Sequence, residues 1–395
     1  MAEQNITSNG TTVSTLCKRC CTSPSVINLR TEHLCSDCFD KYIRSKCIKR
    51  MEAYRVRYNP PDTDTSPRRL LLPLSFGISS TTLLHLLNSQ LQNQLARTTR
   101  TGFVLVVVHI DESAIDPTVP PGEKSMRAVQ ERFPHVGEYL VVKLEGIYEF
   151  PSAVKAFEMG VGGSGGGDWE EKLKDLLGAL PSSTSRMDVL HILRTRLITG
   201  LARKHACEAV LWGDTTTRLA EKTLAETAKG RGFSIPWQTS DGDSPYGLKF
   251  LYPLRDLLKK ELAVYISLDA PTPLRPLCSG AAEEGEGKKK YAAVGKGITI
   301  DELMTQYFEG IEGQYPSIVA NVVRTAGKLV TEGGVVRIGR CKICGLPRDG
   351  GGGELVLGAG AKSGETSGGG GKEGGDMCYG CARSVYGARP YEWPL

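Results

Sequence analysis

Cysteine is the residue type with the most chemical potential in this chain of 395 residues, and eight of its 12 cysteines form four C-x-x-C pairs. A two-residue spacer lets both thiolates of a pair reach one ion, and two pairs complete a tetrahedral four-sulfur site. The first two pairs are separated by 14 residues and the last two by 33. The spacing therefore predicts two zinc sites, with ligands Cys17, Cys20, Cys35 and Cys38 in the first and Cys341, Cys344, Cys378 and Cys381 in the second.

Both predicted metal sites would be structural, because four sulfur ligands leave no open position for water. An iron–sulfur cluster is the competing interpretation, since four cysteines can also bind one. Cys21 follows the first pair directly and could replace Cys20 as a ligand. We expect the remaining cysteines to be buried thiols. Cys47 lies on the apolar stripe of a predicted helix, whereas Cys207 and Cys278 are isolated in the sequence. For Cys278, in a proline-rich loop, a reactive role is the other interpretation.

Positive charge is concentrated in one short segment. Residues 41–57 carry seven Lys and Arg against one acid, Glu52, so this segment has a charge of +6, while the whole chain has +5 and its other residues sum to −1. Such a patch beside a zinc module favours contact with RNA phosphates over a merely solvated helix face. The predicted tRNA-binding residues are Lys41, Arg44, Lys46, Lys49, Arg50, Arg55 and Arg57, with Arg68 and Arg69 as an extension of the patch.

The elements that must position these groups follow from the periodicity. Short apolar runs at 70–74, 103–111, 139–144, 209–212 and 249–252 alternate with helical stretches at 81–95, 186–206, 218–229 and 255–267. Alternating strands and helices predict crossover units and an open parallel sheet, and continuously apolar strands indicate that both sheet faces are covered. We therefore expect an α/β domain over residues 70–270.

The rest of the chain divides around that domain. We expect a disordered tail at 1–15, a zinc module with the basic helix at 16–58, a linker at 59–69, a connecting helical region at 271–340 and a second zinc module at 341–395. Glycine-rich or charged insertions are expected at 160–168, 281–290 and 349–376. The longest apolar run, at 102–110, is far shorter than the roughly 20 residues of a membrane helix. Without a targeting segment either, a cytoplasmic protein is the expectation.

The loop after the first strand has the composition of a phosphate site. Ser75-Phe76-Gly77-Ile78-Ser79-Ser80 runs from a buried strand into a helix, where an open α/β sheet binds anions with loop N–H groups. With the acids that end the second strand, Asp111 and Glu112, this order resembles the PP-loop ATP pyrophosphatases that modify tRNA, whose motif is Ser-Gly-Gly-x-Asp-Ser. Residues 211–220 stand where that family has a Gly-His-Asn-x-Asp-Asp loop, and 252–256 resemble its Pro-Leu-Arg segment.

Flanking cysteine pairs narrow the resemblance to the partner subunit of the eukaryotic wobble-uridine thiolase. It implies a Rossmann-like PP-loop domain flanked by two zinc modules with four cysteine ligands each. It also implies a degenerate nucleotide-binding site, made by Ser75, Gly77, Ser79, Ser80, Gly213 and Asp214.

Departures from the family motif argue against ATP binding and against catalysis. Phe76 replaces the first glycine, where a side chain would crowd a bound pyrophosphate. Ser79 replaces an aspartate and Asp214 a histidine. Active members also carry a C-x-x-C between the two loops, with a thiolate that handles sulfur; the equivalent residues 181–186 contain none. We therefore predict no catalytic residues.

The resemblance implies the following function. The chain would form a heterodimer with a catalytic PP-loop subunit, bind tRNA, and support formation of 5-methoxycarbonylmethyl-2-thiouridine at wobble position U34, with sulfur delivered by a thiocarboxylated ubiquitin-like carrier. Two rivals stand beside it: an active ATP-dependent tRNA sulfurtransferase with a divergent loop, and a zinc-module adaptor for nucleic acid or protein. A part in attaching the carrier to proteins (urmylation) belongs to the same resemblance, but no residue of the chain bears on it.

Overall fold

The computed structural model describes most of the chain, namely residues 16–29, 32–56, 67–116, 119–134, 136–150, 169–268, 274–278, 298–329, 337–349 and 377–388. The expected tail at 1–15 and the expected insertions at 160–168 and 281–290 lie outside these residues, as do positions 350–376 of the third insertion. Within the described part, no helix combines the length and the apolar character needed to cross a bilayer.

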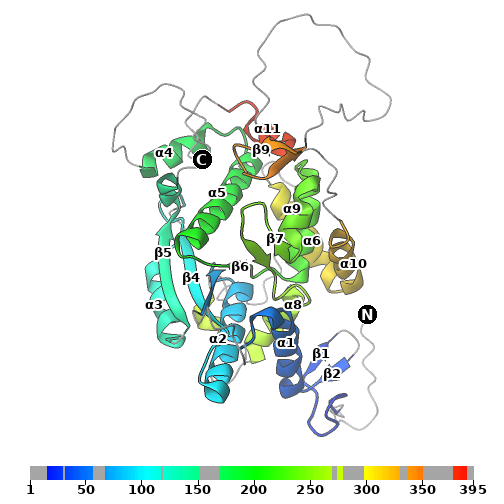
Figure 1. The fold of residues 1–395 in the computed structure, drawn as a ribbon. Helices are drawn as coiled ribbons and strands as arrows, with labels where there is room; N and C mark the ends of the chain where they lie inside the picture. Colours follow the sequence, from blue (N-terminus) through cyan, green and yellow to red (C-terminus); the bar gives the residue numbers. More distant parts are fainter. Residues whose placement is uncertain are drawn as a thin grey trace, which may run out of the picture.

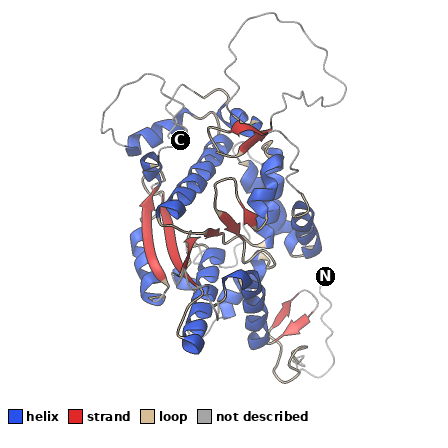
Figure 2. Cartoon of the chain, viewed as in Figure 1, coloured by secondary structure: helices blue, strands red, loops and turns tan. Residues whose placement is uncertain are grey.

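A six-stranded sheet forms the centre of the molecule, in the order β5-β4-β3-β6-β8-β7 (Figures 1 and 2). The first five pair in parallel, as the sequence predicts, and β7 adds an antiparallel edge that the sequence analysis missed. The strands are β3 (Arg68–Pro73), β4 (Phe103–Asp111), β5 (Gly137–Lys143), β6 (Ala209–Leu211), β7 (Gly242–Asp243) and β8 (Lys249–Leu251).

The middle stretches of the central strands are continuously apolar because each strand sends side chains into two cores. In β3, Leu70 and Leu72 face one core and Leu71 faces the other, as the two-residue period of a strand requires. The same alternation holds in β4 and β6. The sheet is therefore covered on both faces, which explains the continuous apolar runs in these strands. Polar residues are confined to the start of β3 and the end of β4.

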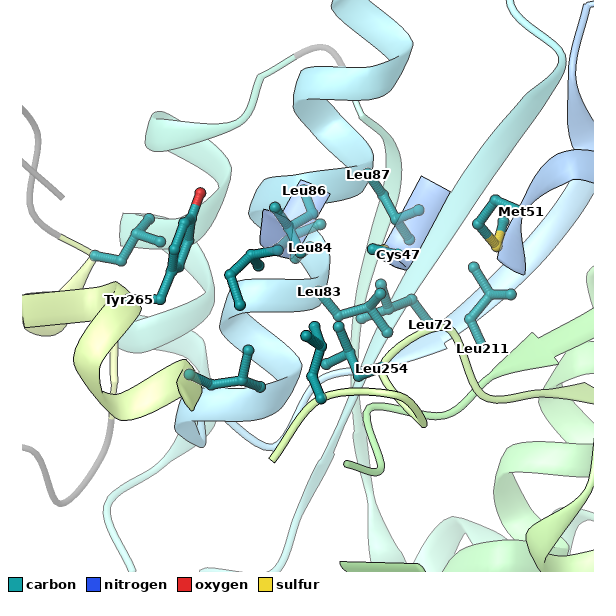
Figure 3. Packing of buried hydrophobic residues seen from close by; sticks show 14 of the residues in the cluster. Cys47, Met51, Leu72, Leu83, Leu84, Leu86, Leu87, Leu211, Leu254 and Tyr265 are labelled. Carbon is teal, nitrogen blue, oxygen red and sulfur yellow. The ribbon is translucent and has the colours of Figure 1, made fainter. Parts of the chain in front are cut away.

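The first core is covered by α1 (Ser36–Arg50), α2 (Ile78–Thr98), α3 (Gly122–Arg132) and α8 (Lys259–Leu268). Helix α1 carries the predicted basic segment, yet its apolar stripe packs into this core. Cys47 and Met51 lie among Leu83, Leu87 and Leu72 (Figure 3), and both are fully buried. The prediction that Cys47 is a core thiol is confirmed.

The second core is covered by α4 (Trp169–Ala179), α5 (Ser183–Lys204), α6 (Thr216–Ala228), α9 (Ile300–Glu312), α10 (Pro316–Ala326), the short α7 (Ile235–Thr239) and α11 (Tyr379–Val385). Helices α3 and α4 were not predicted from the sequence, and the predicted start of α8, at residue 255, is wrong. The helix begins at Lys259 because residues 252–257 form turns, in which Arg255 and Leu257 donate backbone hydrogen bonds to Tyr252 and Leu254. The described residues also form the short 3-10 helices η1 (Glu52–Tyr54), η2 (Leu144–Glu149), η3 (Gly232–Ser234) and η4 (Arg275–Leu277).

Each cysteine module closes one of the two cores. Beside the hairpin β1 (Ile27–Leu29) and β2 (Glu32–Leu34), Cys17 and Cys35 belong to the first core. Beside the hairpin β9 (Arg337–Arg340) and β10 (Pro347–Asp349), all four C-terminal cysteines belong to the second. Figure 1 shows the two modules at opposite ends of the molecule. The modules are thus packed against opposite faces of one sheet.

Candidate functional site

A cavity of about 820 Å³ opens where the strand order reverses. Strand β3 has β4 on one side and β6 on the other, so the chain leaves β3 toward β4 and later returns to β6. Open α/β sheets bind ligands at such a switch point, outside the carboxyl ends of the strands. The six residues predicted from sequence all line this cavity: Ser75, Gly77, Ser79, Ser80, Gly213 and Asp214.

The two loops that bring these residues together touch each other closely. The hydroxyls of Ser75 and Ser80 lie 3.2 Å apart, and the Ser80 hydroxyl donates to the Gly77 carbonyl at 3.2 Å. A Cβ atom at Gly213 would lie 3.1 Å from the Cα of Ser80, which is tighter than an ordinary contact, so glycine favours this close approach of the second loop. Gly77 is the N-cap of α2 and offers no capping side chain. The first N–H groups of α2 therefore keep their capacity to donate to an anion.

The expectation that Phe76 crowds a bound phosphate is wrong in this structure. Phe76 adopts a left-handed backbone conformation, with φ of 55°. That conformation turns its ring into the first core, where it is buried and lies 4.4 Å from the ring of His109. His109 is fixed in turn by its Nδ1, 2.8 Å from the carbonyl of Leu74. The loop thus keeps its opening toward the cavity despite a bulky residue at the glycine position.

The charged side chains of the cavity wall form ion pairs within the chain. Arg194 of α5 forms an ion pair with Glu112, which follows β4, and Lys222 of α6 forms one with Asp214. The other lysines and arginines that line the cavity are paired in the same way: Arg218 with Glu221, Lys259 with Glu309, and Arg231 with Asp188 and Glu226. The wall is therefore neutralised by carboxylates of the chain itself.

Sulfur is present at the cavity only as part of a cysteine cluster. Residues 181–186, which replace the family's C-x-x-C, form the start of α5, where the Ser182 hydroxyl accepts from the Ser185 N–H at 3.1 Å. Among the described residues that line the cavity, the one cysteine is Cys344. Because Cys344 belongs to the C-terminal four-cysteine cluster, it is not a free nucleophile when a metal is bound.

A buried ion network below the cavity was not predicted from sequence. Arg231 donates to Asp188 at 2.8 Å and to Glu226 at 2.8 Å, and Lys229 lies 2.7 Å from Glu226. The pKa of Glu226 is lowered, because Arg231 and Lys229 outweigh the burial that acts to raise it. Ser384 of α11 donates to Asp188 at 2.6 Å, so the network also fastens the C-terminal module. Only the short spacing of Glu226, Lys229 and Arg231 was visible in the sequence; Asp188 comes from another helix.

The N-terminal cysteines converge as predicted. The sulfur atoms of Cys17, Cys20, Cys35 and Cys38 all lie within 4.8 Å of one another, and those of Cys20 and Cys35 are 3.8 Å apart. Cys21 is exposed instead, with its sulfur 3.9 Å from the carbonyl of Lys18, so Cys20 and not Cys21 joins the cluster. Hydrogen bonds from Thr22 lower the pKa of Cys20 to about 5, which suits a thiolate ligand.

The C-terminal cluster is equally compact and is buried. Its sulfur atoms, on Cys341, Cys344, Cys378 and Cys381, also lie within 4.8 Å of one another, with 3.8 Å between those of Cys344 and Cys378. The first pair closes a turn in which Gly345, with φ of 71°, donates its N–H to the Cys341 carbonyl at 2.8 Å. In the second pair, Cys378 is the N-cap of α11.

Both clusters fit a tetrahedral metal site. A metal–sulfur distance of about 2.3 Å in a tetrahedron corresponds to a sulfur–sulfur distance of about 3.8 Å, which matches the closest pairs. Either cluster could hold a metal, and the donor set alone does not distinguish zinc from iron–sulfur. Apart from the exposed Cys21, the thiols outside the clusters are buried. Burial raises the pKa of Cys47 to about 12 and of Cys207 to about 11, and it also raises the pKa of Cys278. Burial favours the inert interpretation of Cys278.

The predicted RNA-binding patch is smaller in the structure than in the sequence. Three arginines are engaged: Arg44 with Asp40, Arg55 with Glu52, and Arg50 with Asp256 and Asp241 across the interface with the α/β domain. Lys46 lies over the ring of Tyr42, whereas Lys41 and Lys49 are exposed. Arg57 lies outside the described residues.

Arg68 and Arg69 do not extend the patch. They belong to β3, where Arg68 donates to Glu208 at 2.7 Å and Arg69 donates to Glu138 at 2.6 Å.

The fold and the cavity define a class. The U34-tRNA thiolase NcsA from Methanococcus maripaludis, solved with its 4Fe-4S cluster, has a similar structure, with a TM-score of 0.53 and 15% identity over 85% of this chain and 92% of that one. The mostly parallel sheet and the switch-point cavity thus have the architecture of a PP-loop protein, as predicted.

Sequence comparison places the chain within that class. A family model described as "Cytoplasmic tRNA 2-thiolation protein 2" matches residues 299–356. Relatives of that name from Phaeosphaeria nodorum and Aspergillus clavatus are 43% and 36% identical, over 94% and 93% of this chain and 95% and 96% of theirs. The chain belongs to the cytoplasmic tRNA 2-thiolation protein 2 family, in agreement with the order of its motifs.

Proposed function

We propose that the chain is the non-catalytic subunit of a cytoplasmic complex that converts wobble uridine U34 of certain tRNAs to its 2-thio form, as required for 5-methoxycarbonylmethyl-2-thiouridine. Membership in the 2-thiolation family supports the reaction. In this proposal the α/β domain at 70–270 is a degenerate PP-loop domain held between two metal modules, at 16–58 and 341–395. The helical region 271–340 connects that domain to the second module.

One observation supports the non-catalytic assignment: in this cavity the groups that the chemistry would use are engaged elsewhere within the chain. Its lysines and arginines are each paired with a carboxylate of the same chain. A triphosphate would have to compete with these internal anions and bring its own charge into a wall that is already neutral. Sulfur transfer also needs a nucleophilic thiolate, and Cys344, the one cysteine among the described lining residues, is committed to a cluster.

The missing chemistry would come from a partner. We infer a heterodimer with a catalytic PP-loop subunit, which activates the uridine with ATP and receives sulfur from a thiocarboxylated ubiquitin-like carrier. Our chain would contribute tRNA-binding surface, for which the exposed Lys41 and Lys49 are the strongest candidates of the basic helix. No described residue supports a part in attaching the carrier to proteins, and the proposal leaves urmylation out.

Nucleoside mass spectrometry of bulk tRNA tests this function. In cells that lack the protein, wobble 2-thiouridine should disappear, while its unthiolated 5-methoxycarbonylmethyl precursor accumulates. Expression of the wild-type chain should restore the thiolated nucleoside. If thiolation is unchanged without the protein, the proposal fails and a metal-module adaptor becomes the better account.

An active sulfurtransferase remains the main rival. It is distinguished by the partner: the isolated chain, supplied with ATP, tRNA and a sulfur donor, should form no 2-thiouridine, whereas addition of the catalytic subunit should. Formation by the isolated chain would establish the rival.

A further inference from the structure

Arg196 of α5 lies against the C-terminal cysteine cluster and takes no part in the cavity described above. A Cβ atom added to Gly345 would lie 3.2 Å from the Cζ of Arg196 and 3.3 Å from the ring of Tyr246. The guanidinium is therefore in contact with the residue that directly follows Cys344. Tyr246, on the same side, donates its hydroxyl to the carbonyl of Cys344 at 2.7 Å.

The cluster next to Arg196 is buried and would carry negative charge. The four cysteines are between 0% and 6% exposed. A divalent zinc ion with four thiolates has a net charge of −2, and so has an oxidised 4Fe-4S cluster with four thiolates. Such a charge in a dry environment is costly unless an opposite charge lies nearby.

Arg196 is suited to supply that opposite charge. None of the described Asp or Glu residues forms an ion pair with it, in contrast to the cations of the cavity wall. Burial lowers the pKa of Arg196, while Tyr246, Cys344 and Cys341 act in the opposite direction. A partly buried cation without a carboxylate partner needs an anion, and the cysteine cluster is the anion beside it.

The N-terminal cluster has a different environment. Its arginine neighbour, Arg19, lies between Cys17 and Cys20 but pairs with Glu32 at 2.9 Å. Cys20 is partly exposed, so water can screen the charge of that site. The two clusters share a ligand set and differ in how their charge is compensated.

We propose that Arg196 is the counter-cation of the C-terminal four-cysteine cluster: a positioning residue that retains the metal through its charge and is not itself a ligand. Arginine is not a residue type that ligates these metals, and Arg196 lies on a different element from all four cysteines. It contacts the turn of the first C-x-x-C pair through Gly345. Groups placed in this way around a metal site commonly change metal affinity by about 10- to 100-fold. This inference depends on metal occupancy of the cluster and stands independently of the thiolation role.

The test measures metal retention by the full-length chain, purified anaerobically. Zinc and iron are counted per chain by mass spectrometry, and release to a chelator is followed with time. A variant with Cys17→Ser and Cys20→Ser no longer releases metal from the N-terminal cluster. The release that remains therefore comes from the C-terminal cluster. We expect Arg196→Gln to accelerate metal release from the C-terminal cluster about 10-fold or more. The release rate of Arg196→Lys should lie between those of Arg196→Gln and the wild type.

Arg203→Gln is the matched control, because Arg203 lies on the same helix and donates to the carbonyl of Tyr246 but does not touch the cluster. It should release metal at the wild-type rate. The proposal is overturned if Arg196→Gln releases metal no faster than the wild type, if Arg203→Gln accelerates release equally, or if Arg196→Lys is as fast as Arg196→Gln. A wild-type chain that holds no metal at the C-terminal cluster would also overturn it. Circular dichroism of each variant reports whether it is folded.

Discussion

Two carboxylates, Glu112 and Asp214, determine what the cavity can accept. Each pairs with a cation on a helix across the cavity, Arg194 on α5 and Lys222 on α6. These are the positions from which a phosphate group would otherwise be held, beside the N-terminus of α2. At the scale of single residues, the chain's own carboxylates therefore pair with two cations of this cavity.

Removing the carboxylates that pair with these cations should increase the affinity of the cavity for an anion. A double variant with Glu112→Gln and Asp214→Asn leaves Arg194 and Lys222 without their internal anions, so we expect it to gain affinity for inorganic pyrophosphate by about 10-fold or more. Calorimetry at low and moderate salt measures the gain, which should weaken as salt screens the charges. Adding Arg194→Gln and Lys222→Gln should abolish it. If the wild-type chain binds pyrophosphate as tightly as the double variant, the charge argument is contradicted.

Glu226 should give the stability of the protein a defined dependence on pH. Its folded-state pKa is lowered from an ordinary value of about 4.3. The ionised group therefore stabilises the fold fully above that value, and the stabilisation is lost as the pH falls below it. Glu226→Gln leaves Arg231 and Lys229 less well compensated and should cost about 3–5 kcal/mol at pH 7.

Denaturant unfolding at several pH values checks this. The difference in unfolding free energy between the wild type and Glu226→Gln should narrow between pH 5 and pH 3. A difference that stays constant over that interval would show that Glu226 does not carry the charge we assign to it.

At the scale of elements, the C-terminal cluster fixes the position of α11. This helix has only seven residues, too few to be stable alone. Cys378 is its N-cap, Cys381 lies in its first turn, and Ser384 binds the ion network. With a metal bound at the cluster, its order would depend on that metal as well as on packing.

Loss of the metal should accordingly release α11. We expect Cys378→Ser, or chelation of the wild-type protein, to raise hydrogen exchange across residues 377–388 to near the rate of an unfolded segment, while β3 and β4 stay protected. Cys21→Ser is the matched control, because Cys21 is exposed and outside both clusters. Unchanged exchange in the Cys378 variant would show that packing alone holds α11.

The elements that the sequence predicted well are those whose signal is local. Strand β4 occupies the predicted residues because it is rich in apolar and branched residues, with six of them in a row at 103–108, and both cysteine clusters follow from spacing alone. Helix α4 was missed although Leu173, Leu176 and Leu177 have helical spacing. The orientation of Phe76 could not be predicted, since it depends on a backbone angle. Nor could the pairing of Arg194 with Glu112, which lie 82 residues apart and meet only when the sheet forms.

At the scale of the whole molecule, the sheet is held between two cysteine modules, and cations of its cavity are paired with the chain's own carboxylates. This arrangement agrees with the proposed function, in which the chain supports a reaction carried out by a partner subunit. The central claim is therefore that thiolation requires this chain but not nucleotide chemistry in its cavity.

Nucleoside mass spectrometry with a loop variant tests that claim most directly. Cells lacking the protein are complemented with the wild type or with a variant carrying Ser75→Ala and Ser80→Ala, which removes both loop hydroxyls. The variant should restore wobble 2-thiouridine to the wild-type level, provided that it is folded and equally abundant. A folded, abundant variant that fails to restore thiolation would mean that the loop is functional, and the account of a non-catalytic subunit would be wrong.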